Sequence, residues 1–571
     1  MSSLLKATIL PVPLDGTLKV EDLSCGMNLS AAIVCHESDL GLDYRKTICY
    51  VWGAGLPGPP LRVPTPLSIR DVRQISCGHT HCGLVTESGM AFTWGSGDHG
   101  MLGHGDKHPV LTPKVVAALV KLKVLSISCG AYHTGIIVCE PGDLHTRWIR
   151  LSSGFSNGGS SSSKSHSRRS GDEGGNEHAL KCGNLYTCGM NKVGQLGHGG
   201  TGSASSSNAT KNSSRNFVAI PKRVTYFDGR GSGEEGPLLV AKVSCGMHHT
   251  LMLCVPFDES RAVGNLPQTR VYSCGWGEHG RLGTGDEEIR TIPTKIEFTM
   301  PNTSDQSFCA IEIAAGEQHS LAAGREGAYS WGSNSMGQLG IGSPVTSEIA
   351  LVPLRIPLPE GMEVKQLAAG GRHSAAITRC GKLLSWGWGE EGQLGGGNEK
   401  NAVYPRPVRI PKLRNESHKG VPVAVAVGMS HTVVILKNEE HIPPPPRPLS
   451  AIVEIVEPPP TPPMLVLIPK IEEIVLEPVI DPLPVLELEP EPQPLPKTKK
   501  SGMLFDGDED TGTMDSAVRS IRQLLQQREG LSRPHSAEDG FSSEPAAEEE
   551  EVEPEVPIET SFAFFLTEQE D

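Results

Sequence analysis

A short glycine motif recurs seven times along the 571 residues of this chain. In each copy a glycine is followed three residues later by histidine, or once by leucine, and then by a small residue and a short apolar run. The copies begin at Gly26, Gly78, Gly130, Gly246, Gly316, Gly370 and Gly428, and their histidines are His81, His133, His249, His319, His373 and His431, with Leu29 in the first copy. Recurrence on this scale indicates a fold assembled from repeats.

A second signature alternates with the first. It places an aromatic residue, or once Leu384, two positions before Trp-Gly or Cys-Gly. Its tryptophans are Trp52, Trp94, Trp331 and Trp386, and Cys188 and Cys274 take their place in two copies. Five of the six copies continue into Gly-x-Leu-Gly, and the first copy departs from this pattern.

The spacing of the repeats favours propeller blades. Successive glycines of the first motif lie 52, 52, 116, 70, 54 and 58 residues apart, and a period in the fifties with insertions is typical of such blades. Short β-branched runs bounded by glycine turns, such as Ile136 to Val138, predict strands. Four short strands cannot cover both faces of their own sheet, whereas a closed ring of sheets can. We therefore predict an all-β propeller over residues 1–440, with low-complexity insertions near 152–181 and 200–217.

The two motifs together resemble the repeats of the regulator of chromosome condensation family, whose pattern is similar to Tyr-x-Trp-Gly-x-Asn-x-x-Gly-Gln-Leu-Gly plus Gly-x-x-His-Ser/Thr. Residues 329–340 match this pattern best, and the resemblance covers roughly residues 9–437. It implies a seven-bladed β-propeller. In the ultraviolet-B photoreceptor branch of the family, Trp follows the first-motif glycine in several blades. None of the seven residues at that position here is Trp, so the resemblance does not extend to light sensing by such a cluster.

The seventh repeat lacks an obvious strand. There are seven copies of the first motif but six of the second, and the chain runs from Leu436 almost directly into a proline run at 443–446. Family propellers close by pairing strands from both chain ends. We therefore expect residues 7–10, or an apolar tail segment such as 464–467, to complete this blade.

Charge divides the chain at about residue 450. Residues 1–450 carry a net charge of +5 and residues 451–571 a net charge of −20. The prolines and acidic residues of the tail predict disorder over 441–571, with a possible short helix at 515–528 and an acidic-aromatic motif around Phe562, Phe564 and Phe565. Such a tail is either a solvated, repulsive segment or an element that folds back on a basic face.

Neither the cysteines nor the termini indicate a secreted or membrane protein. The fourteen cysteines show no Cys-x-x-Cys pair, and six of them occupy repeat positions, which predicts small buried residues and neither zinc ligands nor disulfides. No segment reads as a signal peptide or a membrane span. We expect a location in the nucleus, the cytoplasm or both.

The six repeated histidines invite a metal or acid-base interpretation. Equivalent positions on different blades are dispersed around a ring, so we expect each imidazole to hydrogen-bond backbone at a strand turn. Three Gly-x-Gly-x-x-Gly segments recur inside the repeats without a following helix, which excludes a dinucleotide site. We therefore expect no catalytic residues, no metal, no cofactor and no small-molecule substrate.

The function that these observations favour is a non-catalytic regulatory propeller that binds protein partners through its loop faces. The family resemblance supplies two alternatives, guanine-nucleotide exchange on a Ran-like small GTPase and association with chromatin. Exchange in the family uses loops and a β-hairpin insertion. Lys164, Arg168 and Arg169 in the insertion at 152–181 are candidate phosphate contacts for nucleosomes.

Overall fold

The computed structural model describes residues 8–10, 18–36, 47–53, 56–63, 71–140, 148–150, 179–200, 216–229, 236–257, 268–299, 308–342, 348–359, 362–410, 420–437 and 562–566. These residues belong to one compact unit, which comprises residues 1–443 and 512–571. The second unit, 444–511, lies outside the described residues, as do the possible helix at 515–528 and the candidate closing segment at 464–467.

Six four-stranded antiparallel sheets each take their strands from one stretch of chain. The first contains β2 (Leu18–Cys25), β3 (Leu29–His36), β4 (Thr47–Gly53) and β5 (Leu56–Arg62). The second contains β6 (Val72–Cys77), β7 (His81–Thr86), β8 (Ala91–Gly95) and β9 (Val110–Val115). The third contains β10 (Lys123–Cys129), β11 (His133–Cys139), β14 (Asn184–Met190) and β15 (Phe217–Arg223).

The next three sheets repeat this order. The fourth contains β16 (Leu238–Cys245), β17 (His249–Pro256), β18 (Arg270–Gly275) and β19 (Arg290–Lys295). The fifth contains β20 (Ala310–Ala315), β21 (His319–Gly324), β22 (Gly327–Ser333) and β23 (Ile349–Arg355). The sixth contains β24 (Val364–Ala369), β25 (His373–Thr378), β26 (Leu383–Gly387) and β27 (Ala402–Pro407).

A further four-stranded sheet draws on both ends of the chain. Its order is β1 (Thr8–Leu10), β30 (Phe562–Leu566), β29 (Thr432–Lys437) and β28 (Val421–Val427). The prediction of seven blades is therefore confirmed only in part. Six sheets take all four of their strands from one stretch of chain, whereas this sheet needs strands from both chain ends. Residues 8–10 do join it, but β30 lies between them and β29. For residues 562–566 the predicted disordered tail is wrong, since they form a strand.

The remaining elements are short. Helical turns of 3-10 type occur at η2 (Asp98–Gly100), η3 (Ala117–Leu119), η4 (Thr225–Asp228) and η7 (Glu278–Gly280). A separate hairpin of β12 (Trp148–Arg150) and β13 (Ala179–Lys181) lies within the third repeat and pairs Trp148 with Lys181. Its first strand precedes the low-complexity insertion predicted near 152–181, and its second strand forms the last three residues of that range.

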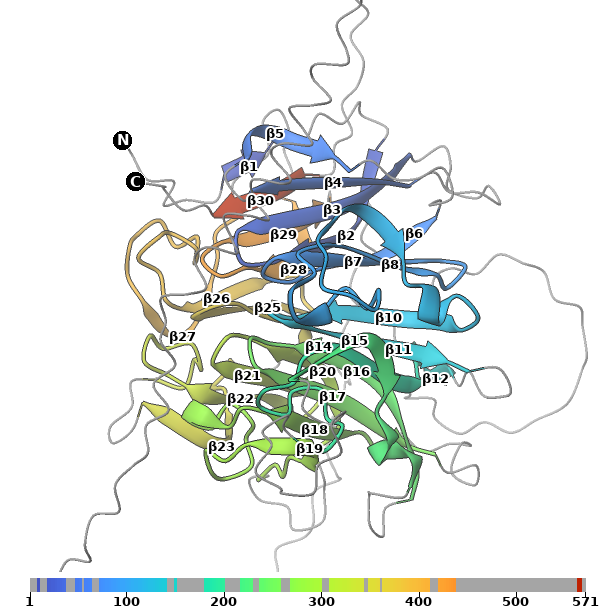
Figure 1. The fold of residues 1–571 in the computed structure, drawn as a ribbon. Helices are drawn as coiled ribbons and strands as arrows, with labels where there is room; N and C mark the ends of the chain where they lie inside the picture. The colour runs from blue at the N-terminus through green and yellow to red at the C-terminus, as the bar shows by residue number, and fades with distance from the viewer. Residues whose placement is uncertain are drawn as a thin grey trace, which may run out of the picture. The chain divides into compact units, whose positions relative to one another are not determined.

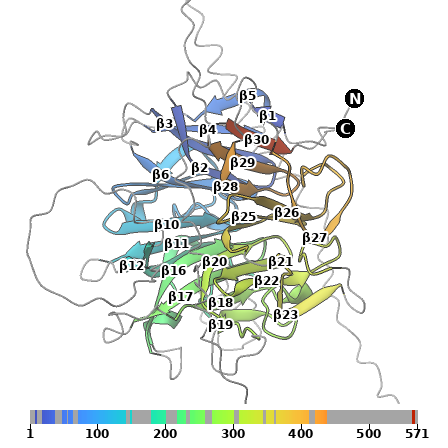
Figure 2. The same ribbon diagram turned by 180° about the vertical axis from the view of Figure 1, so that it is seen from behind.

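The sequence of each strand matches its position in the sheet. Second strands such as β7 and β25 are buried at every residue, because neighbouring blades pack on both faces of the sheet. Fourth strands are edges and carry a proline, as at Pro293 of β19, which an edge strand tolerates. Figures 1 and 2 show the sheets following one another in chain order, with the blue first blade beside orange β28 and β29. The predicted all-β propeller is confirmed.

Candidate functional site

The six repeated histidines link neighbouring repeats. Each imidazole Nε2 lies within hydrogen-bond distance of a Ser or Thr hydroxyl in the first motif of the next repeat, and the last one closes on the first repeat. The pairs are His81–Thr134 (2.8 Å), His133–Thr250 (2.8 Å), His249–Ser320 (2.9 Å), His319–Ser374 (2.9 Å), His373–Thr432 (2.9 Å) and His431–Ser30 (2.7 Å). The backbone partner expected for these imidazoles is therefore wrong, since the partner is a hydroxyl. We call these six residues the junction histidines.

In five of the six pairs the hydroxyl fixes the tautomer of the imidazole, because it donates to a backbone carbonyl. Ser374 donates its only proton to the carbonyl of Gln338 (2.9 Å), and Thr134 donates to Met101 (2.8 Å). Since a hydroxyl has one proton, the facing Nε2 must be the donor. Each accepting carbonyl belongs to the residue before Leu in Gly-x-Leu-Gly, so one hydrogen-bond chain joins both sequence motifs.

Burial keeps the junction histidines neutral. Desolvation lowers the pKa of His319 to about 3 and that of His431 to about 4, from an ordinary 6.5. Nδ1 of His319 has no hydrogen-bond partner among the described residues, so nothing there compensates a second proton.

One junction of the ring is apolar. The first repeat has Leu29 where the others have histidine, and the second repeat has Cys82 where the others have Ser or Thr. Cys82 is buried and Leu29 packs against the same apolar cluster. The fold therefore accepts either a polar or an apolar pair at this position.

Removing one junction imidazole should destabilise the propeller. We expect His319→Ala or His373→Ala to lower the free energy of unfolding by about 1 to 3 kcal/mol, because the facing hydroxyl loses its donor. Urea denaturation followed by tryptophan fluorescence measures this change. A variant of full stability that lost one particular activity would instead assign that histidine a functional role.

The tryptophans of the second signature are packing residues. Trp52, Trp94, Trp331 and Trp386 are all buried. The indole N–H groups of Trp331 and Trp386 donate to the carbonyls of Arg281 and Gln338, each at 2.9 Å. A Cβ on Gly283 would lie 2.8 Å from the Trp331 ring, which explains the final glycine of Gly-x-Leu-Gly.

The seven first motifs converge on an axial cavity of about 100 Å³, lined by three residues from each copy. This volume is small compared with ordinary ligand pockets of roughly 300–1,000 Å³. The surface around the cavity is therefore a better candidate site than the cavity itself.

A group of ring side chains gathers beside this cavity. Tyr132 stacks on His248 with ring centroids 5.4 Å apart, and His79 and His99 approach its edge at 6.2 and 6.0 Å. The ring centroids of His248 and Trp276 also lie 5.4 Å apart. Together with Arg281, described next, these residues form what we call the axial cluster: His79, His99, Tyr132, His248, Trp276 and Arg281. Its five ring-bearing members are partly exposed.

Arg281 anchors one end of the axial cluster. Its guanidinium lies 5.0 Å from the Trp276 ring and donates to the carbonyls of Glu278 (2.8 Å) and Glu317 (3.1 Å). Burial lowers its pKa to about 10, so it stays charged at neutral pH. Three sister repeats have glutamine at this position: Gln195, Gln338 and Gln393. The sequence analysis missed Arg281, although this departure from glutamine was visible.

The charge of this surface comes from a few groups. Desolvation lowers the pKa of His79 to about 4 and that of His248 to about 3, so both are neutral at pH 7. Burial raises the pKa of Glu317, against the effect of Arg372 and Arg281. Arg372 is exposed. The surface therefore presents aromatic and neutral imidazole groups with cationic neighbours.

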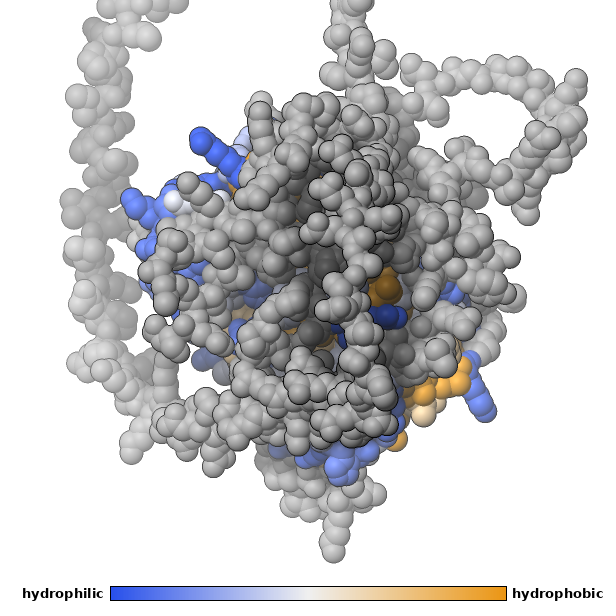
Figure 3. Space-filling view, turned by 90° about the horizontal axis from the view of Figure 1, so that it is seen from above, coloured by the Kyte–Doolittle hydropathy of each residue, from blue (hydrophilic) through white to orange (hydrophobic). Residues whose placement is uncertain are grey.

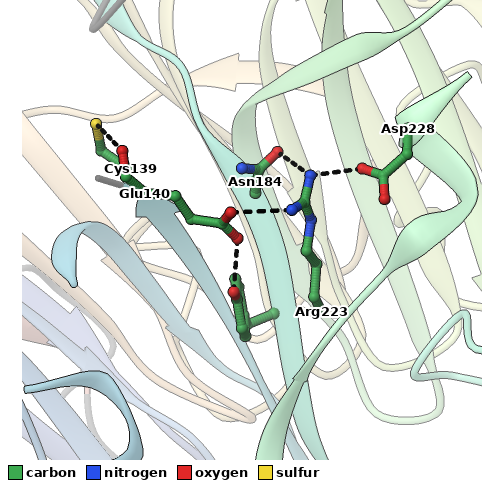
Figure 4. Close-up of polar contacts among 6 residues, drawn as sticks. Cys139, Glu140, Asn184, Arg223 and Asp228 are labelled. Atoms are coloured by element: carbon green, nitrogen blue, oxygen red, sulfur yellow. Dashed lines mark hydrogen bonds and ion pairs between the residues drawn. The ribbon is translucent and has the colours of Figure 1, made fainter. Parts of the chain in front are cut away.

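A second polar network lies at the base of the third-repeat insertion (Figure 4). Arg223 of β15 donates to Glu140 (2.9 Å), Asn184 (3.2 Å) and Asp228 (2.6 Å). The Tyr186 hydroxyl donates to the other oxygen of Glu140 at 2.6 Å. The network fixes the end of β11, from which the insertion departs. The insertion cations Lys164, Arg168 and Arg169 lie outside the described residues.

The outer strands carry scattered apolar residues. Ile220, Ile292, Val352 and Tyr404 each precede a proline and are about half exposed. Figure 3 shows hydrophobic surface beside hydrophilic surface on the described part of the chain. Exposed apolar residues recur at this position from blade to blade. We therefore regard their exposure as a property of the outer strand and not as evidence of a binding patch.

Within the described residues no group of three or more His, Cys, Asp or Glu side chains could hold a metal ion. No disulfide joins the cysteines of the described residues, and most of these cysteines are buried. No helix among those residues is long and apolar enough to cross a bilayer.

These features define a repeat-built β-propeller whose sheets are joined by histidine–hydroxyl pairs. The chain belongs to the regulator of chromosome condensation (RCC1) repeat family. One model of this repeat matches residues 88–137, 183–253, 269–323, 327–377 and 381–435, and a second matches 310–338 and 364–393. The resemblance seen in the sequence is thus confirmed.

Curated relatives share the repeats. The Ultraviolet-B receptor UVR8 of Arabidopsis thaliana is 30% identical over 360 residues, which cover 60% of this chain and 72% of UVR8. Human Protein RCC2 is 26% identical over 400 residues, covering 65% of this chain and 68% of RCC2. Human E3 ubiquitin-protein ligase HERC2 is 24% identical over 379 residues, which span 65% of this chain but only 6% of HERC2.

Among solved structures, human WBSCR16 matches with a TM-score of 0.49 at 20% identity, covering 74% of this chain and 88% of that one. Prp20p from Saccharomyces cerevisiae has a TM-score of 0.48 at 18% identity, covering 72% and 81%.

Proposed function

We propose that this protein is a non-catalytic regulatory propeller that binds a protein partner through the axial cluster. The observation that carries this proposal is the gathering of Tyr132, His248 and Trp276 around a buried, charged Arg281 at positions where the repeat pattern does not require them. Aromatic residues and arginine dominate the energetics of protein interfaces. The partly exposed rings offer apolar area with little side-chain entropy to lose.

Comparison with sister repeats indicates that the fold does not require imidazole at position 248 or guanidinium at position 281. The backbone carbonyl of His248 accepts from Trp276 N–H (3.0 Å), and that of Gln318 accepts from Ser333 N–H (2.9 Å) in the next repeat. The same backbone link therefore forms with imidazole or amide side chains. Glutamine is thus a native alternative at both position 248 and position 281.

The test uses the double variant His248→Gln with Arg281→Gln. We expect it to weaken binding of the partner at least about tenfold while the unfolding transition stays unchanged, because a central interface residue contributes over 1 kcal/mol. Proteins retained by the wild-type chain are identified by quantitative affinity purification, and the dissociation constant of each is then measured by calorimetry.

Ile292→Thr on the outer strand β19 is the matched control, since its side chain is exposed on another part of the propeller. It should retain the same partner at wild-type affinity. Equal binding by all three proteins would exclude the axial cluster as the contact.

Guanine-nucleotide exchange on a Ran-like small GTPase is the second candidate. The observation that favours it is the β12–β13 hairpin, because exchange in this family employs a hairpin insertion. Nucleotide-release assays with purified GTPases test it. Unaccelerated release by a chain that still binds its partner would exclude exchange.

Association with chromatin is a third candidate. It predicts salt-sensitive nucleosome binding that is lost when Lys164, Arg168 and Arg169 are replaced by glutamine. Unchanged binding would exclude these cations as the main contact. All three functions are compatible with a location in the nucleus, the cytoplasm or both.

We also propose that the sheet of β1, β30, β29 and β28 is a seventh blade. The close approaches between first-motif glycines support this, since a Cβ on Gly428 would lie 2.6 Å from the carbonyl oxygen of Gly26. Met429 N–H also donates to the carbonyl of Met27 (3.3 Å), one residue beyond the glycine carbonyl that accepts the corresponding bond between other repeats, such as Gly371 N–H to Gly428.

A further inference from the structure

The last strand of the chain lies inside a sheet. β30 pairs antiparallel with β29 over Thr432↔Leu566 to Leu436↔Phe562, and with β1 over Thr8↔Phe565 to Leu10↔Ala563. Figure 1 shows red β30 between β1 and β29. The strand is therefore hydrogen-bonded along both of its edges.

The sequence of β30 suits a strand between two packed blades. Val433 and Ile435 of β29 belong to an apolar cluster shared with the first blade, whereas Val434 and Leu436 belong to one shared with the sixth. The register places Phe565 opposite Val433 and Phe564 opposite Val434. All five residues of β30 are apolar, which is what a sheet buried on both faces requires.

The connection to β30 differs from every other connection within a blade. Residues 438–561 separate β29 from β30, a connection of 124 residues whose ends meet at the same end of the sheet. The entropic cost of closing a loop grows with its length, so a connection of 124 residues closes less favourably than a short hairpin. β30 is therefore joined to its neighbour β29 by a much longer connection than any other strand of a blade.

We propose that Phe562–Leu566 is a releasable strand, and that the site between β29 and β1 is a strand-acceptor site for an extended apolar peptide of this type. The chain's own carboxyl-terminal segment occupies the site and competes with peptides added in trans. This inference rests on the seventh-blade closure proposed above and is independent of the axial cluster.

A cysteine pair tests the closure. Directly opposite residues of antiparallel strands have Cα atoms about 4.5–5.5 Å apart, within reach of a disulfide. In the full chain Val433→Cys with Phe565→Cys should oxidise to an intrachain disulfide, mapped by mass spectrometry. The register control Val433→Cys with Phe564→Cys should form at least about tenfold less. Equal yields, or none, would overturn the closure itself.

Peptide competition tests release. The probe is a fluorescent peptide of residues 558–571, and the full-length release variant is Phe562→Asp with Phe564→Asp. We expect the release variant to bind the peptide saturably and the wild type at least about tenfold more weakly. Thr567→Asp with Gln569→Asp adds the same charge outside the strand and should behave as wild type. Equal affinity of release variant and wild type would overturn release even if the disulfide forms.

Two measurements do not depend on the release variant folding. In the wild type, the amides of 432–436 that bond to β30 should exchange hydrogen at least about tenfold faster than amides of 373–378 in β25, because β25 has no releasable neighbour. The oxidised Val433→Cys with Phe565→Cys chain should lose peptide binding and regain it on reduction. Equal exchange in the two strands, or binding indifferent to oxidation, would show that the strand is not released.

Discussion

The propeller should unfold cooperatively when the pH falls from about 6 to about 4. The junction histidines are neutral in the folded state, with pKa values of about 3 for His81, His133, His319 and His373 and about 4 for His431, and well below 6.5 for His249. In the unfolded chain their pKa is about 6.5. Since the unfolded state binds the extra protons, the stability contribution is complete above pH 6.5 and is lost as the pH falls.

The size of this effect follows from linkage. One proton bound only by the unfolded state changes the free energy of unfolding by about 1.4 kcal/mol per pH unit, so six junction histidines together give about 8 kcal/mol per pH unit. Asp22 opposes them, because burial raises its pKa to about 6. Folded domains have total stabilities of about 5–15 kcal/mol, so one or two pH units should decide between folded and unfolded chain.

Urea denaturation at a series of pH values between 7.5 and 4.5 measures this slope. The control is His319→Leu with Ser374→Cys, which copies the apolar pair of Leu29 and Cys82 at the first junction. It should lower the slope by about 1.4 kcal/mol per pH unit. A stability independent of pH between 7 and 5 would contradict the burial of neutral imidazoles.

Much of the fold followed from local sequence rules. The glycine turns, the buried second strands and the edge prolines each obey constraints that act within one repeat, so six blades could be predicted without coordinates. The role of the junction histidines was only half predicted. Their structural character was anticipated, but the hydroxyl partner lies in the next repeat, and the spacing within one motif carries no information about it.

The parts that could not be predicted depend on long-range geometry. Phe562–Leu566 was interpreted as a linear motif because acidic residues surround it, and nothing in those residues indicates pairing with a strand 124 residues earlier. Arg281 and Trp276 lie in the same β18–β19 loop, but Arg281 also donates to the carbonyl of Glu317 in the next repeat, and the local sequence does not indicate that contact. A comparison of equivalent positions across repeats does flag Arg281, since three of its counterparts are glutamine.

A single methyl group at the centre of the propeller should disrupt the fold. In Gly370→Ala the new Cβ would lie 2.0 Å from the carbonyl oxygen of Gly428 and 2.5 Å from Cγ1 of Val427. The first contact is with backbone, so no side-chain rotation relieves it. The same glycine-to-carbonyl approach joins all seven first motifs, including Gly428 to Gly26, so a shift at one junction is resisted by the whole ring.

We expect Gly370→Ala to lower the free energy of unfolding by about 3 kcal/mol or more, at the upper end of overpacking effects, because backbone must move in a closed ring. Thermal and urea denaturation measure the loss. Gly396→Ala is the matched control, since the only atom near its new Cβ is a side-chain oxygen of Asn398 at 3.8 Å, and its stability should change by less than about 0.5 kcal/mol. Equal stability of the two variants would show that the close approach of neighbouring repeats is not the reason for glycine at the first-motif positions.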